Sequence, residues 1–212
     1  MSAIVEVLLR VSFSIGSEPV TWLELIGFVS GAVCVWLTVR QHILNWPVGL
    51  VQVVAYIFVF LDAKLYADAG LQMVYVVLGI WGWVNWTRGY TNIPMKPRSS
   101  TNLELQMQLL FLGIITGLLW LWLSVKTDSN TPIPDAFTTA LSLVATYGQA
   151  RKLIESWYFW ILADLIYVPL YLCKHLPLTA ILYTGFLAMC VMGLRAWVKD
   201  GTKFNTTYEC EF

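Results

Sequence analysis

The chain contains seven predominantly apolar stretches, each near the length that crosses a bilayer as a helix. They are Trp22–Val39, Trp46–Leu61, Ala69–Trp86, Leu105–Val125, Asp135–Gln149, Trp157–Cys173 and Leu178–Trp197. A spanning helix needs about 20 apolar residues, with about 17 to 25 tolerated, so the second and fifth stretches are short. With 58% hydrophobic and 12% charged residues, the composition excludes an ordinary soluble domain. We therefore predict an all-α, polytopic membrane protein with seven transmembrane helices, kinked in the sixth at Pro169.

The 13 basic residues are divided unequally between the two sides of these predicted spans. Arg10, Lys64, Lys126 and Lys174 lie on the side of the N-terminus, and the other nine lie on the opposite side. The positive-inside rule then predicts an N-terminus outside the cell and a C-terminus inside. The formal net charge of +0 leaves no basic excess for nucleic-acid binding, so no nucleic-acid partner is expected.

The spans divide the chain into five segments. An N-terminal interfacial segment is expected over 1–21, in which Met1–Ser14 is too short to span and would form an interfacial helix rather than a signal peptide. Two three-helix units are expected over 22–86 and 135–197. Residues 87–134 would form a cytoplasmic loop, a linker helix and a second loop, and residues 198–212 a cytoplasmic tail.

The two three-helix units are related by an internal repeat with an offset of 111 residues, which aligns Arg40 with Arg151. The same offset aligns Trp46 with Trp157, Tyr56 with Tyr167, Gly82 with Gly193 and Trp86 with Trp197. Compositional bias would match Leu and Val, but it does not explain several matched Trp, Tyr, Gly and Arg residues. Because one unpaired helix separates the units, both run in the same direction across the membrane. This 3+1+3 arrangement of parallel repeats is typical of transporters, whose substrate site lies near the midplane.

Residues three and four apart share one face of a helix, and several such faces are aromatic or polar. The candidate substrate-binding residues are Trp157, Trp160, Asp164 and Tyr167 in the sixth span, Trp46, Gln52 and Tyr56 in the second, Gln72 and Tyr75 in the third, and Gln149 at the end of the fifth. The face of the seventh span carries Tyr183, Phe186, Cys190, Gly193 and Trp197. Aromatic faces attract cations and amides bind hydroxyls, so the set suits a planar, cationic solute that carries a sugar.

Asp164 is the most informative of these residues because an acid inside a span costs about 2.5–3.5 kcal/mol on insertion scales. The alternative interpretations are a structural hydrogen bond to another helix and a protonated carboxyl group. For Trp46, which lies at a span end with Trp86 and Trp197, the alternative is an anchor at the membrane interface.

The cysteines and the small-residue pairs have simpler interpretations. Cys34, Cys173 and Cys190 lie in apolar stretches without the spacing of a disulfide framework or a zinc site, and are predicted to be small buried hydrophobes. No metal and no cofactor are expected. Two GxxxG patterns, Gly27–Gly31 and Gly113–Gly117, predict close helix packing.

Four motifs together resemble the PnuC family of bacterial nicotinamide riboside transporters. They are Asn45-Trp46-Pro47-x-Gly49, Leu65-Tyr66-Ala67-Asp68-x-Gly70-Leu71-Gln72, the run from Glu155 through Trp157, Trp160, Asp164, Tyr167 and Pro169 to Tyr171, and Gly193-x-x-x-Trp197. The resemblance covers about Trp22 to Lys199. It implies a fold related to SWEET sugar transporters, a homotrimer in the bacterial inner membrane, and facilitated diffusion of nicotinamide riboside toward NAD synthesis. It also implies a cytoplasmic kinase that traps the imported riboside, and a Trp-x-x-Trp substrate motif at Trp157 and Trp160.

Three alternatives remain at this point. The same architecture is found in relatives that carry thiamine or riboflavin. A membrane-embedded enzyme would need paired carboxylates, a His cluster or an activated nucleophile, whereas His42 and His175 lie in loops on opposite sides and Asp164 has no acidic neighbour on its face. A purely structural membrane scaffold would not explain an acid within duplicated helices. For the transporter, membrane lipid is expected as a partner beside the small-molecule substrate.

Overall fold

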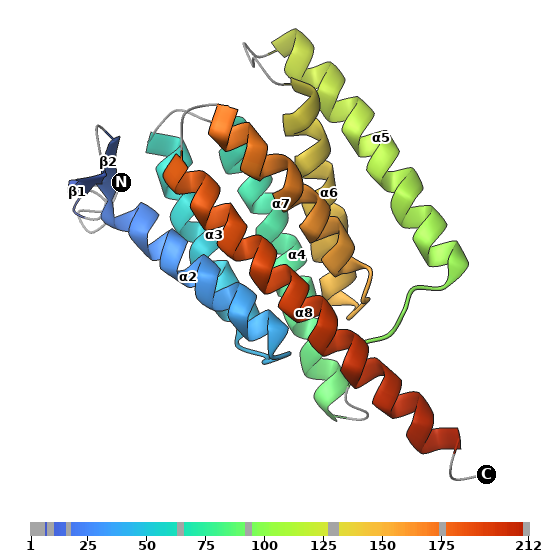
Figure 1. The fold of residues 1–212 in the computed structure, drawn as a ribbon. Coiled ribbons are helices and arrows are strands. Elements are labelled where there is room, and N and C mark those ends of the chain that lie inside the picture. The colour runs from blue at the N-terminus through green and yellow to red at the C-terminus, as the bar shows by residue number, and fades with distance from the viewer. Residues whose placement is uncertain are drawn as a thin grey trace. The chain divides into compact units, whose positions relative to one another are not determined.

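The helices whose bounds the structure describes number seven and follow one another in the order three, one, three, as the sequence predicts (Figure 1). The structure is a computed structural model that describes residues 7, 11–15, 18–62, 66–91, 95–126, 132–173 and 177–209. The helices are α2 (Trp22–Val39), α3 (Asn45–Asp62), α4 (Tyr66–Thr91), α5 (Asn102–Lys126), α6 (Pro132–Ala150), α7 (Ser156–Cys173) and α8 (Pro177–Glu209). Leu65 and the side chains of Tyr66, Ala67, Asp68 and Tyr171, which contribute to the quoted motifs, lie outside the described residues.

The helix boundaries follow local sequence signals. Thr21 and Glu24 form a capping box at the start of α2, in which each side chain accepts a hydrogen bond from the other's backbone N–H. Proline occupies the first position of α6 and of α8, where its missing N–H is not needed. The last helix extends to Glu209 and so continues through most of the predicted tail.

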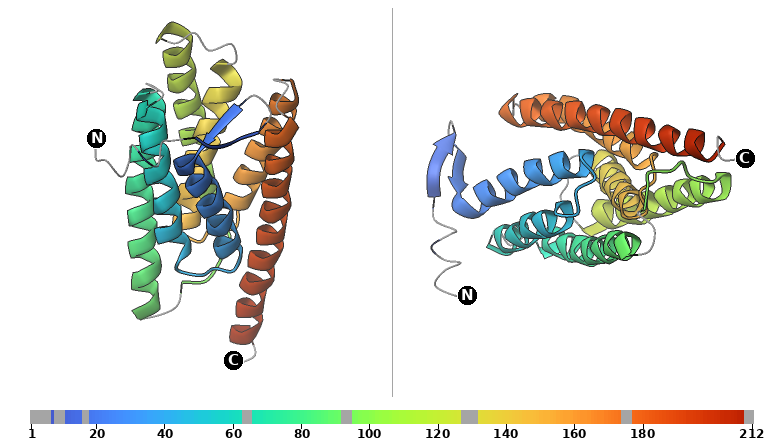
Figure 2. Two further views of the ribbon diagram at one scale, coloured as in Figure 1. Left: turned by 90° about the vertical axis from the view of Figure 1, so that its left-hand side faces the viewer. Right: turned by 90° about the horizontal axis from the view of Figure 1, so that it is seen from below.

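Near the N-terminus, the expected interfacial helix is wrong for Val11–Ser14, because these residues belong to a strand. Strand β1 (Val11–Ile15) pairs antiparallel with β2 (Glu18–Thr21), and Figure 2 shows this hairpin leading directly into α2. Apolar and polar residues alternate through Val-Ser-Phe-Ser-Ile, which is the period of a strand rather than of a helix. Most of the preceding ten residues lie outside the described part of the chain.

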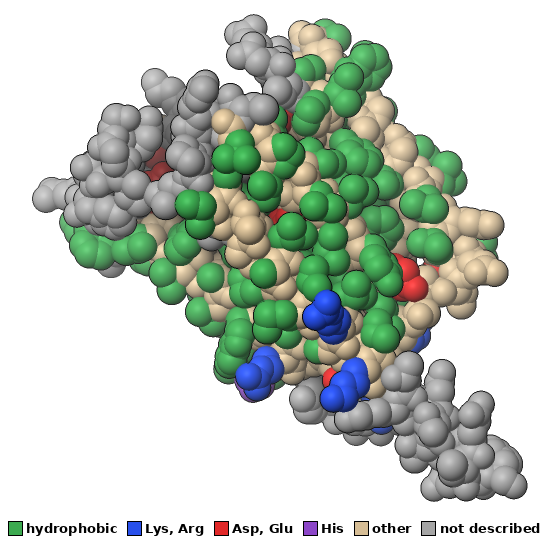
Figure 3. Space-filling model, viewed as in Figure 1, with side chains coloured by type: hydrophobic (Ala, Val, Ile, Leu, Met, Phe, Trp, Pro, Cys, Tyr) green, Lys and Arg blue, Asp and Glu red, His purple; other side chains and the backbone are tan. Residues whose placement is uncertain are grey.

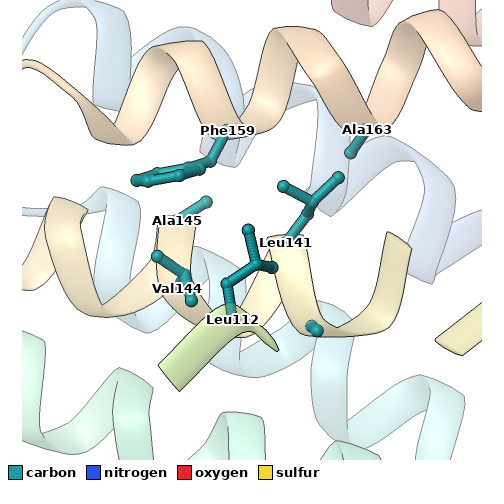
Figure 4. Close-up of a cluster of buried hydrophobic side chains, with 7 residues drawn as sticks. Leu112, Leu141, Val144, Ala145, Phe159 and Ala163 are labelled. Carbon is teal, nitrogen blue, oxygen red and sulfur yellow. The ribbon is translucent and has the colours of Figure 1, made fainter. Parts of the chain in front are cut away.

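The chain divides into two compact units, residues 1–87 and 88–212. In unit 1, α2 packs against α3. In unit 2, α5 packs on α6, α6 on α7 and α7 on α8. The core of unit 2 is a cluster to which α5, α6 and α7 all contribute (Figure 4). Its buried members are Leu112 from α5, Ala140, Leu141, Val144 and Ala145 from α6, and Phe159 and Ala163 from α7.

Many large apolar side chains are exposed, as expected where lipid covers the helices. On α5, for example, Leu103, Met107 and Leu110 are each more than 60% exposed. Along α8, Figure 3 shows mostly apolar side chains, with Lys and Arg side chains near the end that continues toward the C-terminus. By length and apolar character alone, three of the described helices qualify to cross a membrane: Trp22–Val39, Asn45–Asp62 and Asn102–Val125. In α7 the apolar stretch Ser156–Leu170 is shorter than this length.

Candidate functional site

Each unit contains two tryptophans whose rings pack edge to face, and a glycine lies against one of the two rings. In unit 1, the rings of Trp46 and Trp86 have centroids 5.5 Å apart and planes at 87°. In unit 2, Trp157 and Trp197 have centroids 5.4 Å apart and planes at 90°. These four residues are at most 7% exposed, so the interpretation of Trp46, Trp86 and Trp197 as interfacial anchors is wrong. Edge-to-face packing is a favourable geometry for aromatic pairs.

A glycine makes each tryptophan pair possible. A Cβ atom added at Gly82 would contact the Trp46 ring, and one added at Gly193 would lie 2.5 Å from Cζ2 of Trp157. The turn before each pair is repeated as well. Gln41 has φ of 54° and Lys152 has φ of 51°, at positions that the 111-residue offset aligns. The repeat therefore preserves a packing unit of two tryptophans, a glycine and a left-handed turn.

Asp164 lies in the middle of α7 and is 5% exposed. Its carboxylate accepts a hydrogen bond from the thiol of Cys190 on α8, with Sγ 3.5 Å from Oδ2. Within the described part of the chain, no Lys, Arg or His forms an ion pair with Asp164, unlike Glu104, which pairs with Arg98 and Arg151. Because a buried carboxylate is costly without a compensating charge, Asp164 is suited to a cationic ligand.

The two helices that carry Asp164 and Cys190 also carry several aromatic rings. The rings of Tyr167 and Tyr183 have centroids 4.9 Å apart, and the Tyr183 ring meets Phe186 edge to face at 5.8 Å. Trp160 is half-buried and packs against the core cluster, and its indole Nε1 is buried without a hydrogen-bond partner among the described residues. An unpaired indole N–H is able to donate to a polar atom of a ligand.

Two of the polar and aromatic candidates in unit 1 lie against the GxxxG face of α2. A Cβ added at Gly27 would meet the Tyr56 ring, and one added at Gly31 would lie 3.0 Å from the amide of Gln52. Tyr56 also stacks on Phe60, with centroids 5.7 Å apart. The GxxxG prediction is thus confirmed for α2. For Gly113 and Gly117 of α5 it stays a prediction, because an added Cβ would have no described neighbour within 4 Å in this chain.

The ten candidate residues separate into two groups of five, one in each unit. Unit 1 holds Trp46, Gln52, Tyr56, Gln72 and Tyr75, and unit 2 holds Gln149, Trp157, Trp160, Asp164 and Tyr167. Gln72, Tyr75 and Gln149 are half-buried. Trp157 is fully buried in its tryptophan pair, so its contacts are with the protein core, whereas Trp160 and Tyr167 retain exposed surface.

The sequence predicts that Cys190 is a small buried hydrophobe on the aromatic face of the seventh span. It is buried, but it is also the hydrogen-bond partner of Asp164. The spacing of the seventh span already places Cys190 on the same helix face as Tyr183 and Phe186, which was the sign of a role beyond filling space. What the spacing of one helix cannot provide is the register between two helices, and that register brings Cys190 to Asp164.

A polar cluster at one end of unit 2 joins the segment before α5 to the turn between α6 and α7. Arg98 donates two hydrogen bonds to Glu104, at 2.7 and 2.8 Å, and Glu104 lies 3.2 Å from Arg151. The carboxylate of Glu155 accepts from both the backbone N–H and the hydroxyl of Ser100, each at 2.9 Å. The bond to Glu104 raises the pKa of Arg98, so that side chain stays charged. The cluster orders the turn from which α7 begins.

Two repeated three-helix units, a linking helix and a buried acid among aromatic rings define a polytopic membrane transporter of the repeat class. The family comparison is consistent with this class. The chain belongs to the nicotinamide mononucleotide transporter family, whose sequence model matches residues 21–199.

Individual relatives agree with the family assignment. The riboflavin/roseoflavin transporter RibM of Streptomyces davaonensis is 26% identical and is aligned over 88% of this chain and 89% of its own length. The nicotinamide riboside transporter PnuC of Escherichia coli is 23% identical, with 92% of each chain aligned. The crystal structure of the vitamin B3 transporter PnuC matches with a TM-score of 0.68 and 25% identity, covering 86% of this chain and 83% of that one.

These findings make the chain a vitamin transporter of the bacterial inner membrane and exclude the membrane-embedded enzyme, because the family and the solved relative are transporters. The relatives differ in the vitamin that their names give.

Proposed function

We propose that this protein takes up nicotinamide riboside by facilitated diffusion, and that the riboside binds beside Asp164. The observation that carries the proposal is a carboxylate that is 5% exposed and has a thiol, but no cation, as its partner within the described chain. A pyridinium ring is a planar cation that would compensate this charge. Tyr167, Tyr183 and Trp160 supply aromatic faces and an indole donor in the same unit.

An amide side chain supports the riboside part of the proposal. Gln149, in the same unit as Asp164, is half-buried, and an amide both donates to and accepts from sugar hydroxyls. In the proposed mechanism the two repeats alternate access to the substrate, with the N-terminus outside and the C-terminus inside. The protein acts as a homotrimer, and a cytoplasmic kinase that need not touch it traps the product for NAD synthesis. The packed tryptophan pairs would keep each repeat rigid while it moves.

Riboflavin is the second candidate, because the RibM relative aligns over nearly the whole chain. Its ring system is planar but neutral and would leave Asp164 without a compensating charge. Thiamine carries a cationic ring but lacks a ribose. The three vitamins therefore differ in whether they carry a cationic ring for the Asp164 carboxylate and a ribose for the amide side chain of Gln149.

Binding titrations of the purified protein with the three vitamins test the substrate. We expect the riboside to bind most tightly, Trp160→Ala to weaken it in a protein that remains folded, and Asp164→Asn to weaken it further. Uptake into proteoliposomes without ATP or an ion gradient tests the mechanism. A riboside that fails to bind, or uptake that requires a gradient, would contradict the corresponding part of the proposal.

A further inference from the structure

The contact between Asp164 and Cys190 is present in one repeat only. The 111-residue offset aligns Asp164 with Val53 and Cys190 with Gly79. In unit 1 a Cβ at Gly79 would meet the side chain of Leu50, at 3.1 Å, so that position is filled by apolar packing. The tryptophan pair and its glycine form equally well in both units. The repeat therefore folds without the acid and the thiol, and their presence in unit 2 is not required by the packing that the units share.

The geometry of the pair indicates what the thiol does. Cys190 is 5% exposed, and its Sγ lies 3.5 Å from Oδ2 of Asp164. A thiol is a weak donor, yet it contributes more when its acceptor is charged. By occupying Oδ2 from α8, the thiol restricts the rotation of the carboxylate, and the lone pairs that it does not use remain available to a ligand.

We propose that Cys190 is a positioning residue that holds the Asp164 carboxylate in the orientation that selects a cationic ring over a neutral ring of the same shape. The inference rests on the proposed function, in that it takes the ligand to bind beside Asp164. It adds a specific role for Cys190 in discriminating charge. A cysteine that only fills space would affect charged and neutral ligands alike.

The test compares two probes that differ in ring charge: nicotinamide riboside and its neutral 1,4-dihydro form. Dissociation constants are measured for the full chain and for Cys190→Ala, Cys190→Ser and Asp164→Asn. The matched control is Cys34→Ala, which removes another thiol whose hydrogen bond goes to a backbone carbonyl, that of Asn45. If Cys190→Ala does not fold, Cys190→Val replaces it as a variant of similar volume that also lacks the donor.

We expect the wild-type protein to prefer the cation and Asp164→Asn to lose the preference. Cys190→Ala should reduce it about fivefold, the size expected for a weak donor to a charged acceptor. Cys190→Ser and Cys34→Ala should keep it. If wild-type and Asp164→Asn behave as expected but Cys190→Ala keeps the full preference, or weakens both probes by one factor, the role of Cys190 is refuted and the proposed function stands. If the wild-type protein binds neither probe, the proposed function fails and this inference with it.

Discussion

Replacing Gly193 with alanine should destabilise the protein measurably, because the added methyl group would enter the ring of Trp157. The new Cβ would lie 2.5 Å from Cζ2 and 2.6 Å from Cζ3 of that ring, and carbon atoms in contact are ordinarily about 3.5–4.0 Å apart. The ring has no exposed surface and is packed edge to face against Trp197, so it has no free space into which to move.

The magnitude follows from two opposing effects. Overpacking a core typically costs about 1–3 kcal/mol, and a rigid, fully buried indole places this site at the upper end. Alanine regains about 1 kcal/mol over glycine through its higher helix propensity. The net loss should be about 2 kcal/mol, which for a chain of this size lowers the Tm by about 4–8 °C.

The assay is thermal unfolding of purified protein in one detergent, followed by tryptophan fluorescence. Gly185→Ala is the matched control, because Gly185 lies in the same helix and an added Cβ would meet no described atom within 4 Å. Gly193→Ala in a Trp157→Leu background should cost much less than in the wild-type protein, since the clashing ring is gone. The reasoning is refuted if Gly193→Ala and Gly185→Ala unfold at the same temperature.

Three further predictions concern the turns and the polar cluster. Glu104→Gln should cost less than about 1 kcal/mol of stability, and the loss should disappear in 1 M NaCl, because the ion pairs with Arg98 and Arg151 are partly exposed and screened by salt; a loss unaffected by salt would contradict this. Burial lowers the pKa of Lys152 from 10.5 to about 8, and the negative charge of Asp200 opposes this shift. Between about pH 8 and 10.5 the unfolded chain therefore binds more protons at Lys152 than the folded protein does. Stability should therefore include a component that rises with pH from about 8 to 10.5, and Lys152→Met, compared with the wild-type protein in parallel unfolding series, should lack it. Gln41→Gly should raise the Tm by relieving about 1 kcal/mol of strain at its φ of 54°, whereas Gln41→Val should lower it; equal effects of the two substitutions would exclude strain as the cause.

Much of the fold could be predicted from the sequence, because a bilayer requires each spanning helix to be apolar and of a set length. The span predicted over Trp22–Val39 coincides with α2, and Trp157–Cys173 differs from α7 by one residue. These boundaries are marked by caps, prolines and the ends of apolar stretches, which are local signals. The strand at Val11–Ile15 was missed because it depends on pairing with Glu18–Thr21 as well as on its own alternation.

The candidate site could be predicted from the sequence only in part. Helical spacing placed Asp164, Tyr167 and Trp160 on one face, and the structure keeps them in one unit beside further aromatic rings. Spacing did not show that Trp157 is fully enclosed, or that the Asp164 carboxylate meets Cys190. Burial and side-chain partners depend on how one helix is rotated and shifted against the next, and residue order within a helix contains neither quantity.

The sequence by itself determined the seven helices, their three-one-three order and the duplication of the tryptophan–glycine packing unit, because hydrophobicity, helix termini and repeats are properties of residues along a chain. Only the tertiary structure decided which tryptophans form the core, that the Gly113–Gly117 pair of α5 has no described helix packed against it, and that the midspan acid is paired with a thiol. Those outcomes depend on distances between side chains of different helices, which are set only when the helices pack.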